Sequence, residues 1–203
     1  MIVSCPYLES HPYMYAIGRM LKELSLEWRL GGNMTKWVAA MAFVATLSGC
    51  TERNLPECSD AIKSRLTAHN FELFDSGFAQ NKDNGMFVTR CAAGQIFRNY
   101  RCKGDSLKLS WDEAGAYASE VAEKTGENWR LPDYSEMQSI FVDQCVNPAA
   151  NPFVFPDMEV TNFWTSSKGL HQDRFRCAVY SFQGNAFCRH SRELEQPFFL
   201  VRD

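Results

Sequence analysis

The sequence predicts an α+β fold: a single disulfide-stapled domain with short helices packed on a small antiparallel sheet. Three observations support this prediction. Helical spacing with capping signals occupies the middle of the chain, short aromatic segments separated by turn residues occupy its last third, and six cysteines follow Cys50. Helices that come first and strands that come later are typical of helices covering one face of a sheet.

Residues 34–49 resemble a bacterial lipoprotein signal peptide. Lys36 precedes an apolar run over 37–47, and Leu47-Ser48-Gly49-Cys50 supplies small residues before a cysteine that can carry lipid. The run is about half of the ~20 residues that a membrane-spanning helix needs. We therefore expect cleavage before Cys50 rather than a transmembrane segment, although a buried or disulfide-bonded Cys50 is the alternative.

A lipid on Cys50 would hold the chain on a membrane without crossing it. Thr51 follows the cysteine, and in the lipoproteins that this signal resembles the absence of Asp there favours export to the outer membrane. We expect a lipid-anchored protein of the cell envelope, in the outer membrane of a double-membraned bacterium.

Residues 1–33 do not fit such a signal, because Glu9, Glu23 and Glu27 stand ahead of its basic region. We expect translation to start at Met34. The alternative is a real N-terminal extension, in which residues 14–30 have the spacing of an amphipathic helix.

Residues 50–84 are expected to form an N-terminal linker and a helix, and residues 85–203 the main domain. Ser59 can cap a helix that runs to about Ala68, with Ile62 and Leu66 one turn apart on its inner face. Within the main domain, residues 86–102 resemble two short strands on either side of Ala92-Ala93-Gly94.

Two helices are expected in the centre. Ser110 and Glu113 form a capping box, Gly126 ends the helix, and its apolar positions are Trp111, Ala114, Ala118 and Val121. Asp133 and Glu136 form a second box that begins a helix with Met137, Ile140 and Phe141 on its buried side.

The last third predicts four strands of one antiparallel sheet. The segments 162–166, 174–182, 185–191 and 198–202 are short and aromatic, and turn residues separate them.

Six cysteines follow Cys50 in this exported domain: Cys58, Cys91, Cys102, Cys145, Cys177 and Cys188. Their even number predicts three disulfides, and the absence of a CxxC pattern argues against a metal or redox site. Sequence alone leaves 15 connectivities open. Cys91 with Cys102 is the best local guess. A tight turn at Gln183-Gly184-Asn185 would place Cys188 opposite Tyr180 or Ser181, so pairing with Cys177 would need a distorted hairpin.

The charge argues against nucleic acid as the partner, because residues 50–203 hold 17 Lys and Arg against 21 Asp and Glu. Residues 112–159 are acidic, with ten acids against Lys124 and Arg130. Two basic segments flank this centre: Arg90, Arg98, Arg101, Lys103 and Lys108 in one, and Lys168, Arg174, Arg176, Arg189 and Arg192 in the other. Ordinary solvated strand faces are the alternative explanation.

An ordered set of short motifs runs from about Gly85 to Asp203: Arg90-Cys91-Ala92-Ala93-Gly94-Gln95, Cys102-Lys103-Gly104, Trp111-Asp112-Glu113-Ala114, Trp129-Arg130-Leu131-Pro132, Asn147-Pro148-Ala149-Ala150-Asn151, Val154-Phe155-Pro156, Phe163-Trp164-Thr165-Ser166-Ser167 and Leu200-Val201-Arg202. Together they resemble the bacterial domain at the C-terminus of the Legionella collagen-like adhesin, the Lcl C-terminal domain. The resemblance implies a C-type-lectin-like or formylglycine-enzyme-like α+β domain and, from the adhesin, binding to sulfated polysaccharides. The chain departs from the adhesin by lacking Gly-X-Y repeats, and Cys58, Cys177 and Cys188 are additions to the common pattern.

Most of these motif residues have the character of core. Trp111, Trp129, Leu131, Phe155 and Trp164 are large apolar groups that would pack together. Arg130, between two of them, could point toward a ligand or form a salt bridge with an acid of the central segment.

Candidate ligand-binding residues are the cations of the second basic segment, Lys168, Arg174, Arg176, Arg189 and Arg192. Arginine offers bidentate donors to sulfate or carboxylate groups, and lysine offers a point charge. The leading hypothesis is a lectin-like domain that binds an acidic glycan, and the alternative is a structural or inhibitory lipoprotein that docks on an envelope or host protein.

We expect no enzymatic activity, no metal and no cofactor. Cys188 and His190 are expected on one face of a strand, and Ser166 or Ser167 could be imagined as nucleophiles, yet the pattern establishes no hydrogen bond between a base and a nucleophile. His171 has no second ligand at metal spacing. A reduced, formylglycine-enzyme-like cysteine pair is less simple than structural disulfides in an exported chain.

Overall fold

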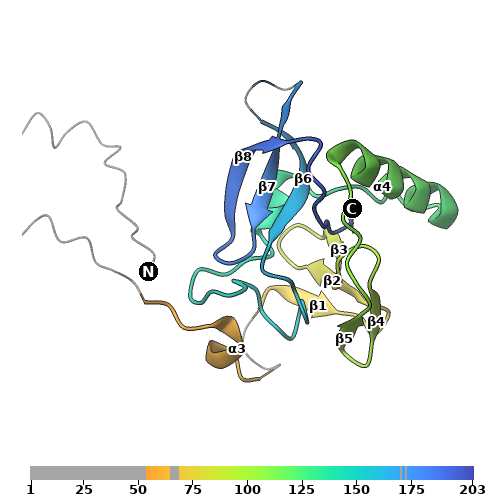
Figure 1. Cartoon of the computed structure of the whole chain (residues 1–203). Coiled ribbons are helices and arrows are strands. Elements are labelled where there is room, and N and C mark those ends of the chain that lie inside the picture. The colour runs from red at the N-terminus through yellow and green to blue at the C-terminus, as the bar shows by residue number, and fades with distance from the viewer. Residues whose placement is uncertain (1–53, 65–68, 170, 172) are drawn as a thin grey trace, which may run out of the picture. The chain divides into compact units, whose positions relative to one another are not determined.

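The computed structural model describes residues 54–64, 69–169, 171 and 173–203. Both the signal segment with Cys50 and the N-terminal residues 1–33 lie outside this range. Three short helices and three antiparallel sheets make up the described part, so the expected α+β class is confirmed (Figure 1).

The first sheet has four strands in the order β1-β2-β3-β9. Its strands are β1 (Phe71–Leu73), β2 (Phe78–Asn81), β3 (Phe87–Thr89) and β9 (Val201–Arg202). Val88 of β3 faces both Ala79 of β2 and Val201 of β9, and all three are fully buried. The C-terminal strand is therefore fixed to the first half of the domain.

The second large sheet has the order β6-β7-β8, and its first two strands contribute side chains to two different cores. It consists of β6 (Asn162–Lys168), β7 (Phe175–Tyr180) and β8 (Asn185–Ser191). Phe163 and Val179 pack into a core with residues of the four-stranded sheet, whereas Trp164 and Ala178 pack into a second core with helix α4. Because neighbouring strand residues point to opposite faces, one sheet separates two cores.

Helices α4 (Trp111–Thr125) and α5 (Tyr134–Gln138) confirm the two central predictions. The capping boxes of Ser110 with Glu113 and of Asp133 with Glu136 both form, and Gly126 ends α4 in the left-handed region at φ 71°. Ala114, Ala118, Met137 and Ile140 are buried as expected. Both helices are thus specified by local signals.

The first helix is shorter than predicted. Helix α3 spans Cys58–Ala61, and Glu57 rather than Ser59 occupies its N-cap position. The backbone N–H of Cys58 donates to the carbonyl of Val146, and the Cys58 sulfur bonds to Cys145. These two long-range links fix where the helix begins, which the local capping signal at Ser59 could not indicate. The predicted end at Ala68 lies outside the described residues.

The expected single sheet was wrong in two respects. Strands β1 and β2 occupy part of the segment 50–84 that was expected to hold only linker and helix. The segment 198–202 contributes β9, which pairs with β3 instead of with the strands of 162–191. Strand β9 was misplaced because its partner β3 is distant in sequence. Strands β1 and β2 were missed because they are too short to show alternation.

Three disulfides form: Cys58–Cys145, Cys91–Cys102 and Cys177–Cys188. The local guess of Cys91 with Cys102 is confirmed. The argument against Cys177 with Cys188 is wrong, because the loop between β7 and β8 holds four residues, 181–184, and Tyr180 faces Asn185.

The longer loop has a physical cause. The N–H of Ser181 donates to Thr161, and the carbonyls of Ser181 and Phe182 accept from Ala149 and Asn147. Because these bonds connect both residues to other segments, Ser181 and Phe182 belong to the loop and do not pair between β7 and β8. The pairing of β7 with β8 is irregular between Arg176 and Ala178, as expected for a distorted hairpin, and there the Cα atoms of Cys177 and Cys188 lie 3.8 Å apart.

Candidate functional site

The five predicted ligand-binding cations all lie on or beside the three-stranded sheet, but only three of them are exposed. Lys168 ends β6, Arg174 precedes β7 and Arg189 lies near the end of β8. None of the three forms an ion pair with another residue in the described ranges. We name Lys168, Arg174 and Arg189 the cationic cluster.

Backbone contacts gather the cationic cluster around the Cys177–Cys188 disulfide. The carbonyl oxygen of Lys168 lies 3.6 Å from the sulfur of Cys177, and the N–H of Gly169 donates to the carbonyl of Phe175 at 3.0 Å. A side chain at Gly169 would overlap the carbonyl oxygen of Cys188, so only glycine permits this approach. The end of β6, the start of β7 and the end of β8 therefore meet at one end of the sheet (Figure 1).

Arg176 lies in the core rather than on the predicted surface. Its side chain is 4 % exposed, and its guanidinium stacks on the Trp111 ring at 4.2 Å from the ring centroid. The indole N–H of Trp111 in turn donates to the carbonyl of Thr165 at 2.7 Å. Arg176 thus connects β7 to the start of α4 and supports the sheet that carries the cationic cluster.

Arg192 forms an ion pair with Asp112. Its Nε donates to Asp112 Oδ2 at 2.8 Å, and its Nη2 also pairs with Asp112. Asp112 lies in the first turn of α4, whose Trp111 N–H donates to the carbonyl of Arg192. Arg192 therefore ties the chain after β8 to α4, and its charge is compensated.

Aromatic rings lie exposed on the same sheet. Phe187 of β8 faces Ala178 of β7 and is 57 % exposed, and the partly exposed Tyr180 faces the exposed Asn185. Phe187 and Tyr180 are therefore diagonal neighbours on one face. They offer flat apolar surface beside polar groups.

His190 lies between the rings of Trp164 and Phe187, with centroid distances of 6.1 and 5.5 Å. Burial lowers the pKa of His190 below its ordinary value, which favours the neutral imidazole near pH 7. This histidine contributes a ring to the aromatic face and no positive charge to the cationic cluster.

Two of the residues considered for catalysis, Cys188 and Ser167, are engaged in other contacts of the fold. Cys188 is bonded to Cys177 and has no free thiol. The Ser167 hydroxyl accepts a hydrogen bond from the N–H of Tyr134 at the start of α5, and Ser166 and His171 are exposed. Across the described ranges, no group of three or more His, Cys, Asp or Glu side chains is arranged to hold a metal ion.

Arg130 forms the salt bridge that was one of its two predicted roles. Its guanidinium bonds both oxygens of Glu136, at 2.7 and 2.8 Å, and also Asp203. These bonds raise the pKa of Arg130 and lower that of Glu136. Glu136 also closes the capping box of α5, so the pair joins the end of the chain to that helix.

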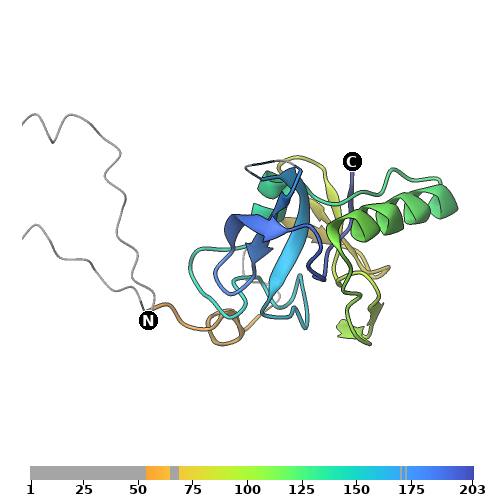
Figure 2. The same ribbon diagram turned by 45° about the horizontal axis from the view of Figure 1, so that its top comes forward.

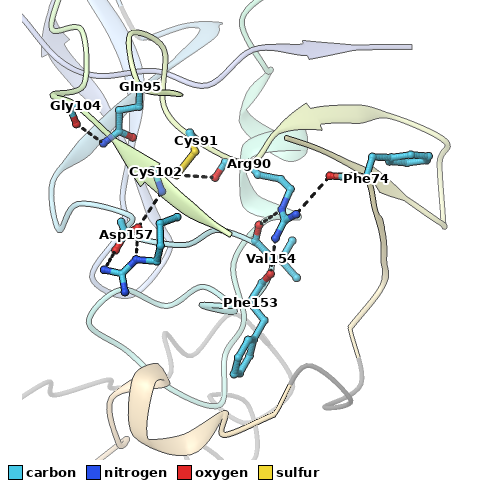
Figure 3. Close-up of a disulfide and its surroundings, with 10 residues drawn as sticks. Phe74, Arg90, Cys91, Gln95, Cys102, Gly104, Phe153, Val154 and Asp157 are labelled. Atoms are coloured by element: carbon cyan, nitrogen blue, oxygen red, sulfur yellow. Dashed lines mark hydrogen bonds and ion pairs between the residues drawn. A yellow bond between two sulfur atoms is a disulfide. The ribbon is translucent and has the colours of Figure 1, made fainter. Parts of the chain in front are cut away.

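Arg90, in the first basic segment, is buried beneath a small hairpin made of β4 (Ile96–Arg98) and β5 (Arg101–Lys103). It donates to the carbonyls of Val154 and Phe153 at 2.9 and 2.8 Å (Figure 3). The remaining cations of that segment lie on the surface. The hairpin itself was not predicted, although Arg101-Cys102-Lys103 alternates charged and apolar residues directly after Asn99-Tyr100.

Among the described residues, no helix has the length and apolar character needed to cross a membrane. The family model described as the Lcl C-terminal domain matches residues 77–202, which is more than half of the chain. No curated protein matches the chain.

Proposed function

The chain belongs to the Lcl C-terminal domain family, and from this membership we propose that its domain binds an acidic glycan at the bacterial cell surface. The observation that carries the proposal is the cationic cluster of Lys168, Arg174 and Arg189. Three exposed cations around one disulfide, with no acid paired to them in the described part of the chain, suit a ligand with several sulfate or carboxylate groups.

Several weak contacts would act together in such binding. An exposed ion pair contributes about 0–1 kcal/mol, so one cation alone cannot hold a ligand. A repeating anionic glycan can contact several cations at once. After its first anionic group is bound, its other groups stay near the remaining cations, so the second and third contacts form at a high effective concentration. The arginine guanidinium adds bidentate geometry for sulfate and carboxylate.

The surroundings of the cluster favour a sugar over a simple anion. Phe187, two residues before Arg189 in β8, is exposed and offers an apolar side chain that can pack against the apolar face of a pyranose. Arg176 and Arg192 hold the sheet against α4, and the Cys177–Cys188 disulfide joins β7 to β8. A rigid frame reduces the ordering cost of binding.

The proposal includes a C-type-lectin-like binding module, one of the two characters that the family resemblance implied, and it assigns this module no enzymatic activity and no cofactor. Its support is that Cys188 and Ser167 are engaged in the fold. A lipid on Cys50 would hold the module on the outer membrane, and the signal-like segment 34–49 is the support for this part.

Heparin-affinity chromatography of the full, oxidised chain tests the proposal. We expect retention that falls steeply with added salt, because exposed charges are screened within about 10 Å at ~0.1 M salt. Lys168→Glu, combined with reversal of Arg174 and Arg189, should abolish retention. Lys82→Glu is the matched control for Lys168→Glu, since Lys82 is also exposed and unpaired within the described residues.

Retention that survives reversal of the whole cationic cluster would refute the assignment of this site. Retention that persists at high salt would argue against charge as its basis. Equal losses for Lys168→Glu and Lys82→Glu would show that only net charge matters.

Docking on a protein partner is the second candidate function. It is favoured by a different part of the molecule, the β4–β5 hairpin, whose exposed face combines apolar and cationic residues.

A further inference from the structure

The β4–β5 hairpin presents one face to solvent and the other to the domain. Ile96 faces Lys103, Phe97 faces Cys102 and Arg98 faces Arg101. Alternation therefore places Ile96, Arg98, Arg101 and Lys103 on one side, and all four are exposed. Cys102 is buried on the other side. We name the first side the outer face. The hairpin itself lies at the edge of the domain in both views (Figure 1 and Figure 2).

The turn of this hairpin is built to be tight. Asn99 and Tyr100 both have positive φ, at 52° and 59°, which is the requirement of a two-residue type I′ turn. Asparagine tolerates this region, whereas tyrosine is uncommon there. The Tyr100 side chain is 47 % exposed at the tip, and its ring lies edge-on to the Phe97 ring with 6.3 Å between the centroids.

The hairpin is held rigid from below. The Cys91–Cys102 disulfide bonds β5 to the segment after β3, and the N–H of Cys102 donates to Asp157 Oδ2 at 2.9 Å (Figure 3). The buried Arg90 lies 4.2 Å from the centroid of the Phe97 ring. Gln95 Nε2 also donates to the carbonyl of Gly104 at 3.2 Å. A surface held in this way is ordered before any partner arrives, which lowers the cost of binding.

The outer face, by contrast, carries features that do not stabilise the fold. Arg98 lies directly opposite Arg101, and like charges in that position destabilise a strand pair. Asp157 pairs with Arg101, but no acid in the described part of the chain pairs with Arg98 or Lys103. Ile96 is 69 % exposed between them. Departures from local rules on a rigid support indicate a functional surface.

We propose that the outer face of the hairpin docks an acidic polypeptide segment of another protein. Arg98 and Lys103 pair with carboxylates of that segment, and Ile96 receives an apolar side chain. An acidic glycan satisfies the two cations but gains little from an aliphatic side chain, whereas burial of Ile96 against an apolar residue is favourable. The face belongs to a different sheet from the cationic cluster, so the proposal stands apart from glycan binding.

A random peptide display library, panned against the full, oxidised chain, tests this proposal. Enriched peptides should combine Asp or Glu with an aliphatic or aromatic residue. Binding of a synthetic copy of one such peptide should weaken about tenfold or more on Ile96→Ser and on Arg98→Glu with Lys103→Glu, as for a central interface residue. Lys168→Glu, in the cationic cluster, is the control and should leave peptide binding unchanged.

Each other result overturns the proposal. No enriched peptide, or peptides indifferent to Ile96→Ser, would show that the face is not a docking site of this kind. Heparin binding that Arg98→Glu with Lys103→Glu abolishes, without any peptide binding, would assign the face to a glycan. Concentration-dependent self-association lost in the same variant would assign it to a second copy of this chain.

Discussion

Arg176 stacks on Trp111 between β7 and α4, and its role can be separated from that of the exposed cations near it. Arg176→Ala removes a desolvated cation–π contact and the packing of a buried side chain. We expect the free energy of unfolding to fall by about 1–3 kcal/mol. Thermal unfolding followed by circular dichroism measures the change.

Lys168→Ala provides the comparison for Arg176→Ala, because Lys168 is exposed on the neighbouring strand. It should leave stability within about 0.5 kcal/mol of the wild type. Equal stability of the two variants would contradict the structural role of Arg176.

We expect His190 to make the domain less stable as the pH falls. Burial lowers its pKa in the folded state below the ordinary value of 6.5. The unfolded chain then binds protons before the folded chain does as pH falls, so stability is complete above about pH 6.5 and declines through the window below it. His69 contributes in the same sense, because burial and the nearby Lys82 lower its pKa.

His190→Gln should therefore reduce the loss of melting temperature between about pH 7 and pH 5.5 without abolishing it, since His69 remains. Differential scanning fluorimetry in buffers of equal ionic strength gives the measurement. A loss as large as that of the wild type would show that His190 is not protonated more readily in the unfolded chain.

At the level of elements, two of the disulfides close loops of very different length. Cys58–Cys145 spans a sequence separation of 87, and Cys177–Cys188 a separation of 11. From loop-closure entropy, replacing both cysteines by alanine should cost about 4–5 kcal/mol for the first pair and about 3 kcal/mol for the second. Urea denaturation of each variant measures these values.

Heparin retention should rank the two disulfide variants in the opposite order to stability. Removal of Cys177–Cys188 loosens the backbone that gathers the cationic cluster, so heparin retention should drop in the variant that loses less stability. Folded protein lacking Cys58–Cys145 should keep its retention. Equal retention of both folded variants would contradict the dependence of the cluster on its disulfide.

The elements that the sequence predicts correctly are those with local signals. Ser110 with Glu113, Asp133 with Glu136, and Gly126 define α4 and α5 from a few neighbouring residues. Strand β8 was predicted at its observed bounds, 185–191, because it combines alternation with a turn before it.

Elements that depend on distant partners were missed. Strand β9 joins β3, and residues 181–182 bond to segment 147–161, which lengthened the loop before β8 and changed the register of Cys177 and Cys188. Likewise, nothing around Arg176 in the sequence indicates that Trp111, 65 residues earlier, would cover it. Charge pattern therefore identified the sheet that carries the candidate site but not which of its cations are free.

At the scale of the whole molecule, Cys50 connects the domain to a membrane in the proposed function. Metabolic labelling with palmitate should mark the wild-type chain, and Cys50→Ala should abolish the label and release the protein from the membrane fraction. Cys5→Ala is the control, because Cys5 lies in the segment 1–33 ahead of the expected start at Met34. Labelling that persists without Cys50 would contradict the lipid anchor.

The central claim is that this domain binds acidic glycans through Lys168, Arg174 and Arg189. A glycan array, probed with the full, oxidised chain at low and at high salt, tests it most directly when the triple charge reversal is probed in parallel. The account predicts binding to sulfated or carboxylated glycans that is lost both at high salt and on reversal. Silence of the wild-type protein across the array, or acidic-glycan binding that the reversal leaves intact, would contradict it.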